Sequence, residues 1–105
     1  MSQAFSLTDE QEAIKRTVRE FGEAEIRPVA DEYEAAQRYP ADLLAAAAEL
    51  DLVAPNVPVE YGGAGMDTLS ELLVTEELWR ADPGIGGSIS AARFGTEMLL
   101  EYGDE

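Results

Sequence analysis

The sequence predicts an all-α domain, a bundle of about five helices with one long loop rich in proline and glycine. Apolar residues recur every three to four positions along most of the chain, which is the period of an α-helix. No stretch alternates apolar and polar residues for long enough to indicate a β-strand. Helix-start signals and Pro/Gly breaks then divide the chain into five helical segments.

The length and the composition indicate one folded domain. A chain of 105 residues can bury well over half of the surface that it exposes when unfolded. Its hydrophobic content of 46% is ordinary for a globular protein, and aliphatic residues occur along the whole length. We therefore expect residues 1–105 to share a single apolar core.

The first helix is predicted to start at Thr8. Thr8 and Gln11 form a capping-box pair, in which each side chain can bond a backbone amide of the other residue. The expected core face of this helix consists of apolar residues at helical spacing: Ile14, Val18 and Phe21. Pro28 disfavours helical geometry at the preceding residue, so the helix should end or kink at Arg27.

Two shorter helices are expected next. The segment 29–37 can offer Val29, Ala30 and Tyr33 to the core. Pro40 suits the first position of a third helix, because an amide hydrogen at that position would have no hydrogen-bond partner within the helix. This helix should end near Asp51.

A long loop follows at residues 52–65, where two prolines and three glycines prevent a continuous helix. Thr68 and Glu71 form a second candidate capping box at the start of a fourth helix. Apolar residues cover more than one side of that helix, which favours burial between two layers.

The fifth helix is predicted to run from Ile85, after a break at residues 82–84, to a C-terminal cap at Gly103. Gly87, Ala91 and Gly95 lie four residues apart and would form a ridge almost free of side chains. Glycine inside a helix costs up to about 1 kcal/mol relative to alanine, so another body should approach this ridge closely. Spacing alone favours a neighbouring helix; the alternative is a ligand lying along the residues Gly86, Gly87, Ser90 and Ala91.

The charge balance is strongly acidic. Asp and Glu number 22 against 7 Lys and Arg, which gives a formal net charge of -15. Such a chain should repel nucleic-acid phosphates. Because the acids are dispersed rather than clustered, we expect a solvated, salt-requiring surface typical of a halophilic protein; a binding face for a basic partner is the alternative.

Several classes of chemistry are disfavoured. The chain has no cysteine and no histidine, so it lacks a thiol nucleophile, a disulfide framework and the commonest metal ligand. We expect no metal site and no catalytic residue. Of Glu76 and Glu77, one is expected to face solvent or an arginine, and neither is expected to act as a general base. The sequence shows no signal segment and no membrane span, so we expect a cytoplasmic protein.

Five segments follow one another in an order that carries a family resemblance. The most specific is PVEYGGAGMD at residues 58–67. The others are LTDEQEAIKRTVREFGEAEIRPVA at 7–30, RYPADLLAAAAELDLV at 38–53, ELLVTEELWRADPG at 71–84 and FGTEMLLEYGDE at 94–105. Together they resemble the N-terminal helical domain of the flavin-dependent acyl-CoA dehydrogenases.

This resemblance implies an activity and a set of site residues. Enzymes of the family oxidise the α,β bond of acyl-CoA thioesters and pass a hydride to FAD, and their catalytic glutamate and main flavin-binding loops lie in a middle β-domain and a C-terminal helical domain. This chain would supply only the first domain, incomplete at its C-terminal end because the family continues with a helix from residues 104 and 105. It should bind no FAD alone and be inactive alone. The residues that would line the acyl-chain pocket are Gly86, Gly87, Ser90, Ala91 and Phe94.

Two details and one alternative accompany the resemblance. An arginine at position 86 or 87 would favour a dicarboxylic substrate, but both positions are glycine. The sequence leaves open where the side chain of Arg93 points. The family more often has glycine at the position of Asp51. The expected partners are the acyl-CoA substrate, the absent domains and a second copy in a homo-oligomer; the alternative function is a separate helical module for interaction or dimerisation.

Overall fold

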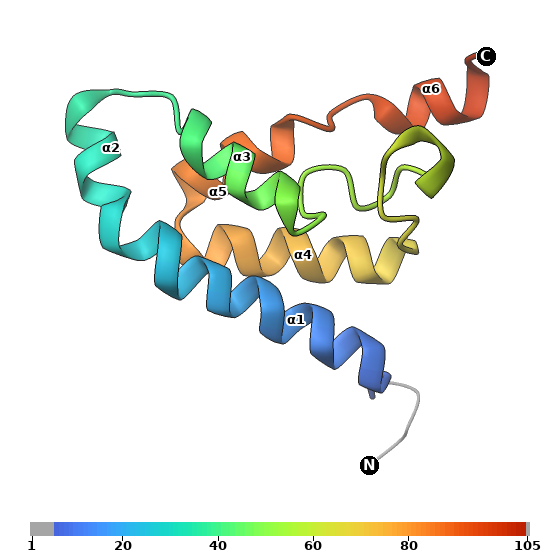
Figure 1. Ribbon diagram of the computed structural model, residues 1–105, viewed down its shortest axis with the longest axis horizontal. Helices are drawn as coiled ribbons and strands as arrows, with labels where there is room; N and C mark the ends of the chain where they lie inside the picture. The colour runs from blue at the N-terminus through green and yellow to red at the C-terminus, as the bar shows by residue number, and fades with distance from the viewer. Residues whose placement is uncertain (1–5, 105) are drawn as a thin grey trace.

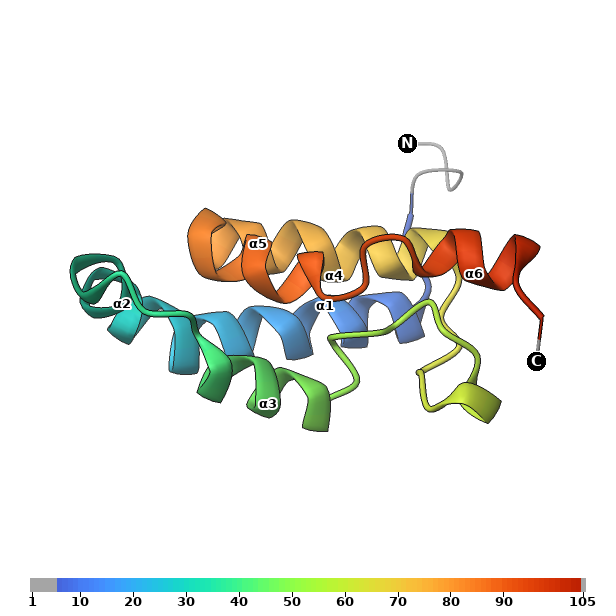
Figure 2. The same ribbon diagram turned by 90° about the horizontal axis from the view of Figure 1, so that it is seen from above.

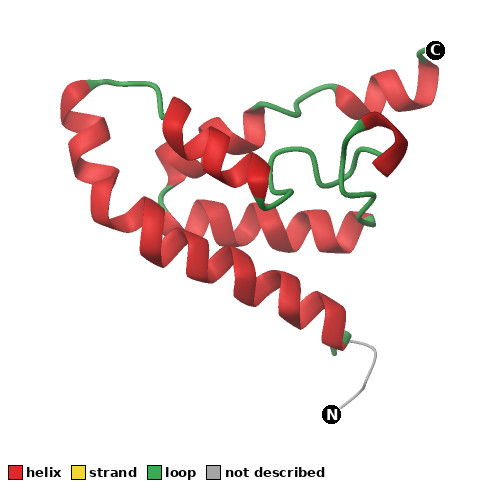
Figure 3. Cartoon of the chain, in the orientation of Figure 1, coloured by secondary structure: helices red, strands yellow, loops and turns green. Residues whose placement is uncertain are grey.

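The computed structural model describes residues 6–104, which form six α-helices joined by turns and one long loop (Figures 1 and 3). No β-strand occurs among these residues, which confirms the predicted all-α class. The α-helices are α1 (Asp9–Phe21), α2 (Ala30–Ala36), α3 (Ala41–Glu49), α4 (Thr68–Ala81), α5 (Pro83–Ala91) and α6 (Thr96–Tyr102).

The helices form a flat, two-layered body. Helix α4 packs against α1 on one side and against α5 on the other, and α3 also contacts α5. Figure 2 shows α4, α5 and α6 in one layer, with α1 and α3 in the other. The body measures 44 × 39 × 18 Å, so its core is thin and many apolar side chains lie near the surface.

One cluster of buried residues holds the two layers together. Helices α1 to α5 all contribute to it, whereas α6 has no buried residue. Burying an aliphatic or aromatic side chain of this size stabilises the fold by about 1.5–3 kcal/mol. The cluster consists of Val18, Phe21, Ile26, Tyr33, Leu43, Ala47, Leu52, Val74, Leu78, Ile85 and Ile89.

Helix α1 starts as predicted. The Gln11 amide donates to the Thr8 hydroxyl at 3.1 Å, and the Thr8 amide donates to the Gln11 side chain at 2.9 Å. These two bonds satisfy backbone donors that have no partner inside the helix.

The connection between α1 and α2 differs from the predicted break at Arg27. Ordinary α geometry ends earlier, at Phe21, and the chain continues through a π-helical turn (Gly22–Ile26) and a 3-10 turn (Arg27–Val29). The Arg27 amide bonds the Gly22 carbonyl five residues back. Because Pro28 lacks an amide hydrogen, the helical path has to change its bonding pattern here. Helix α2 then ends at Gln37, whose φ of 51° is left-handed.

Helix α3 begins one residue later than predicted, because Pro40 takes the capping position before Ala41. After Glu49 the chain turns sharply: the Leu52 amide donates to the Ala47 carbonyl, and Asp51 adopts a left-handed φ of 63°. Glycine is the residue that adopts this conformation without steric cost, which explains why the family prefers glycine at this position.

Replacing Asp51 with glycine should therefore stabilise the domain by up to about 1 kcal/mol. The gain comes from relief of left-handed strain and is offset in part by the greater freedom of glycine in the unfolded chain. Urea unfolding measures it. Ala48→Gly, at an exposed position inside the same helix, is the matched control and should destabilise the domain by about 1 kcal/mol. An equal loss in both variants would contradict the strain argument.

The predicted capping box at Thr68 and Glu71 is wrong. Helix α4 is capped by Asp67, whose carboxylate accepts a hydrogen bond of 2.8 Å from the Ser70 amide. Thr68 is the first helical residue instead, and Glu71 bonds an arginine on another element. The Ser70 amide also lowers the pKa of Asp67, because it stabilises the charged carboxylate. Asp and Thr are both good caps, so sequence could not choose between adjacent positions.

The prediction of one fifth helix is also wrong. Helix α5 stops at Ala91, and a turn at residues 92–95 precedes α6. The break occurs at Gly95, which has a left-handed φ of 89°, and a β-carbon at this position would meet no atom within 4 Å. Gly95 therefore does not extend a ridge from Gly87. Gly103 does cap α6, in an extended conformation; Glu105, in the expected start of a further helix, lies outside the described residues.

Candidate functional site

The five predicted site residues lie on two faces of the α5 segment. Gly86 and Ser90, four residues apart, are turned toward α4 and the interior, with Gly86 buried and Ser90 half-buried. Gly87 and Ala91 form the next row, which is more exposed, and Phe94 follows in the turn after the helix. The structure therefore brings only part of the predicted set to one surface.

Gly86 lets α5 approach α4 at backbone distance. A β-carbon at this position would lie 2.3 Å from the Leu78 carbonyl oxygen, far inside van der Waals contact. A neighbouring helix thus accounts for Gly86, whereas the predicted ridge does not make this contact, because Gly87 faces the Trp79 side chain and Gly95 meets no atom within 4 Å.

Replacing Gly86 with alanine should lower the free energy of unfolding by about 2 kcal/mol, because the two backbones must separate to admit the methyl group. Chemical denaturation measures this loss. Gly84→Ala in the same helix is the control: its new methyl group would meet only the Asp82 carboxylate at 3.3 Å, and alanine favours the helix, so little change is expected. A tolerated Gly86→Ala would show that the helix contact is looser than described.

The outer row forms a small apolar strip together with α4. A β-carbon on Gly87 would lie 3.2 Å from the Trp79 ring, and Trp79 itself is 48% exposed. Ala91 is exposed one turn further on, and Phe94 is 91% exposed, the highest value among the large apolar residues described. We call Trp79, Gly87, Ala91 and Phe94 the outer strip.

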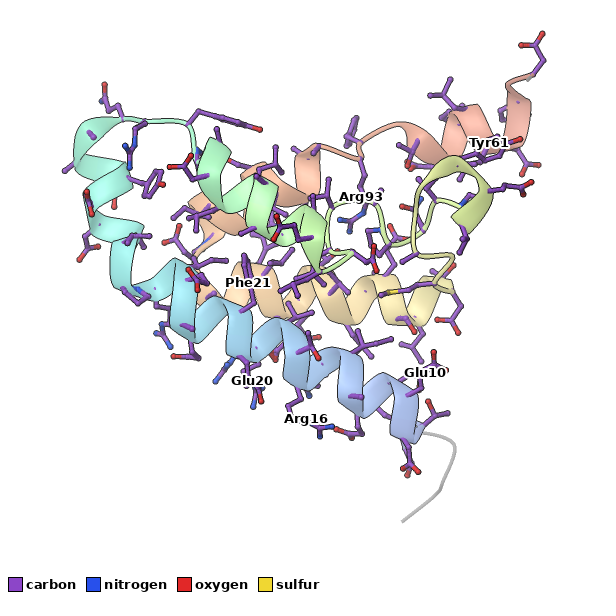
Figure 4. All side chains as sticks on the ribbon, in the orientation of Figure 1. Glu10, Arg16, Glu20, Phe21, Tyr61 and Arg93 are labelled. Atoms are coloured by element: carbon purple, nitrogen blue, oxygen red, sulfur yellow. The ribbon has the colours of Figure 1, made fainter. Side chains whose placement is uncertain are left out.

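Arg93 points into the protein and away from the outer strip. The residue is only 8% exposed, and Figure 4 shows its side chain over α4, beside the long loop. Its Nε donates to Glu71 Oε1 at 3.2 Å, and its Nη2 donates to the Thr75 hydroxyl. Glu71 and Thr75 lie one turn apart on α4, so a single guanidinium bridges two successive turns of that helix. The direction left open by the sequence is thus inward.

Three buried polar atoms near the α5–α6 turn have no hydrogen-bond partner among the described residues: Arg93 Nη1, Ser90 Oγ and Asn56 Oδ1. The Asn56 amide donates to the Thr96 hydroxyl at 3.2 Å, which ties the long loop to the start of α6. Sequence reasoning did not single out Asn56, Thr75 or the contact of Glu71 with Arg93, because nothing in their local spacing indicates a contact with a residue about 20 to 40 positions away.

Of the candidate pair on α4, Glu77 is buried and Glu76 is exposed. The Glu77 carboxylate accepts hydrogen bonds from Arg19 Nε at 3.2 and 3.3 Å and from Arg19 Nη2 at 2.8 Å. These bonds and the charge of Glu77 raise the pKa of Arg19. Arg80 lies 3.9 Å from the same carboxylate. Glu77 therefore acts as a structural anchor between α1 and α4, as the arginine-bound interpretation predicted.

Most basic residues are already engaged inside the chain. Arg19, Arg27, Arg80 and Arg93 form ion pairs, and the guanidinium of Arg38 stacks 4.3 Å from the centre of the Tyr33 ring. These arginines therefore do not form the cluster of basic side chains that would bind a polyphosphate group.

A broad hollow lies between α6 and the long loop. It has a volume of ≈ 590 Å³ and is lined by Val57, Tyr61, Thr96, Leu99, Leu100, Gly103 and Asp104. A second hollow of ≈ 410 Å³ separates α2 from the start of α5. Apolar residues of α6 remain largely exposed, among them Leu99 at the first hollow and also Met98 and Tyr102.

Residues 6–104 contain neither a candidate membrane span nor a candidate metal centre. None of the helices in that range has the length and apolar character needed to cross a bilayer. No group of three or more carboxylates in that part of the chain is arranged to hold a metal ion.

The chain matches known proteins over almost its whole length. The family model of the acyl-CoA dehydrogenase N-terminal domain covers residues 8–105. The chain is 34% identical to a short-chain-specific acyl-CoA dehydrogenase of Clostridium acetobutylicum over 96% of its length, and 32% identical to an acryloyl-CoA reductase (NADH) of Anaerotignum propionicum over 94%. It is also 34% identical to a 3-(aryl)acrylate reductase of Clostridium sporogenes over 93%.

These matches concern one part of the relatives. The chain spans about a quarter of their length, namely 27%, 25% and 26% of the three proteins. The part that matches is the N-terminal domain in the family model, and the all-helical fold agrees with it. The chain therefore belongs to the acyl-CoA dehydrogenase family, whose N-terminal domain it represents.

Proposed function

We propose that this domain walls part of the acyl-chain pocket in an FAD-dependent enzyme that oxidises the α,β bond of acyl-CoA thioesters. The observation that carries the proposal is the outer strip, in which Trp79 and Phe94 expose apolar side chains and the α5 residues Gly87 and Ala91 are small. Gly87 lets the Trp79 ring lie against α5, and the small Ala91 side chain leaves room beside that ring for an alkyl chain, while Gly86 and Ser90 support the surface from behind. The domain alone is inactive and binds no FAD.

The charge distribution supports an uncharged acyl chain as the group bound here. Arg93, which precedes Phe94, is held inward by Glu71, and Arg80, which follows Trp79, lies 3.9 Å from the carboxylates of Glu23 and Glu77. The arginines in ion pairs are engaged elsewhere, so the CoA phosphates would be bound by other parts of the enzyme. Further apolar surface also fits this role: Leu69 and Leu72 of α4 and Leu99 of α6 are exposed and would pack against the further domains.

The test begins with the reading frame that contains this chain. If it continues beyond Glu105, the whole product should purify as a yellow protein with one FAD per chain and should reduce an electron-accepting dye when given acyl-CoA. The 105-residue chain, purified in parallel, should do neither. A colourless full product, or a 105-residue chain that turns over acyl-CoA, would refute the proposal.

The exposed apolar residues of α6 favour a second candidate function, a separate interaction module that dimerises. An apolar surface of more than a few hundred Å² is rarely left open in a monomer. Light scattering distinguishes the two candidates: the module should be a dimer at micromolar concentration, and Leu99→Glu, at a 72%-exposed site, should make it monomeric. A 105-residue chain that is monomeric at every concentration would exclude this candidate.

A further inference from the structure

The turn between α5 and α6 is attached to α4 through one buried side chain. Arg93 spans from this turn to Glu71 Oε1 at 3.2 Å and to the Thr75 hydroxyl. The Thr75 hydroxyl itself donates to the Glu71 carbonyl at 3.1 Å, so its oxygen is fixed in the position where it accepts from Arg93. The guanidinium is therefore held by two groups whose own positions are set by α4.

The residue that follows Arg93 is exposed. Phe94 is 91% exposed, and its amide donates to the Ala91 carbonyl at 3.0 Å. Gly95 comes next with its left-handed φ of 89°, a conformation that few residues hold without support. Apolar packing fixes this turn only weakly, since α6 contributes no buried residue. Two polar contacts therefore hold the turn on either side of Phe94: Arg93 with Glu71 and Thr75, and Asn56 with Thr96.

We infer that Arg93 is a positioning residue that holds Phe94 at the end of the outer strip and so sets the length of acyl chain that the enzyme accepts. This inference rests on the proposed function, because the outer strip is proposed to contact the acyl chain. Arg93 acts through the turn and does not touch the substrate. Loss of its attachment should let Phe94 move and lengthen the accepted chain.

The first measurement does not depend on enzymatic activity. In Arg93→Met, amide hydrogen exchange at Phe94, Thr96 and Met98 should accelerate about tenfold, while exchange at the amides of α1 stays unchanged. Arg93→Lys, which keeps the charge but can reach only one of the two acceptors, should lie between Met and the wild type. Equal acceleration in α1 would show a general loss of stability and would overturn the positioning role.

The second measurement is the chain-length profile of the whole enzyme. For Arg93→Met, KM for acyl-CoA thioesters longer than the best wild-type substrate should fall about fivefold while kcat for that best substrate is unchanged. Glu71→Gln should change the profile in the same direction but less, because glutamine still accepts a hydrogen bond. Arg27→Met, at an exposed ion pair of α1's continuation, is the matched control and should leave the profile unaltered.

The outcomes separate the two proposals. A wild-type enzyme that oxidises no acyl-CoA would refute the proposed function. Hydrogen exchange alone would then test whether Arg93 holds the turn. An active wild type whose profile is the same in Arg93→Met would overturn the role of Arg93 in specificity and leave the proposed function intact.

Discussion

Replacing Arg19 with methionine should lower the melting temperature of this domain by about 15 °C. The reason lies with Glu77, whose side chain is 1% exposed and accepts three hydrogen bonds from the Arg19 guanidinium. Without Arg19, the one cation left near the buried carboxylate among residues 6–104 is Arg80, 3.9 Å away. Differential scanning calorimetry measures the shift.

Two variants test whether the buried charge causes this loss. The double variant Arg19→Met, Glu77→Leu removes both charges and should recover most of the stability, because an apolar pair is often as stable as a buried ion pair. Arg16→Met is the matched control on the same helix; Arg16 is exposed, on the outer side of α1 in Figure 4, and should change the melting temperature by no more than about 2 °C. If the double variant were no more stable than Arg19→Met, lost packing rather than buried charge would be the cause.

Local signals predicted the helices well, and contacts between distant residues explain what they missed. Thr8 and Gln11 predicted the start of α1 because both partners of the capping box lie within one turn. The break after α3 was predicted near Asp51, and its left-handed φ follows from the same local geometry. The site could be predicted only in outline, because spacing alone could not tell that Gly86 faces α4 while Gly87 faces the Trp79 ring.

The errors have a common physical origin. A helix-period pattern ran from Ile85 to Leu99, yet Gly95 interrupts it, since apolar periodicity does not reveal a left-handed glycine. The ion pairs of Arg19 with Glu77 and of Arg93 with Glu71 join residues 58 and 22 positions apart. The sequence shows that these residues carry opposite charges and can pair. Which residues do pair is decided by the packing of α1 and of the α5 segment on α4.

The melting temperature should also rise by about 15 °C as KCl increases from millimolar to molar concentration. The net charge of -15 repels itself, and the described ion pairs engage only Glu23, Glu71 and Glu77 among the acids. The other carboxylates act on one another across a body only 18 Å thick. At about 1 M salt the Debye length falls to roughly 3 Å, which screens these repulsions.

A variant with fewer acids tests whether repulsion is the cause. Five exposed glutamates that take part in no described ion pair can be changed to glutamine together: Glu10, Glu20, Glu25, Glu32 and Glu34. This variant should melt at a higher temperature than the wild type in low salt and should gain less from KCl. Sucrose at the same osmolality strengthens apolar burial without screening charge, so it should not distinguish the two proteins. A wild-type midpoint that stayed level or fell as KCl rose would refute a salt-requiring surface, since screening can only relieve repulsion among like charges.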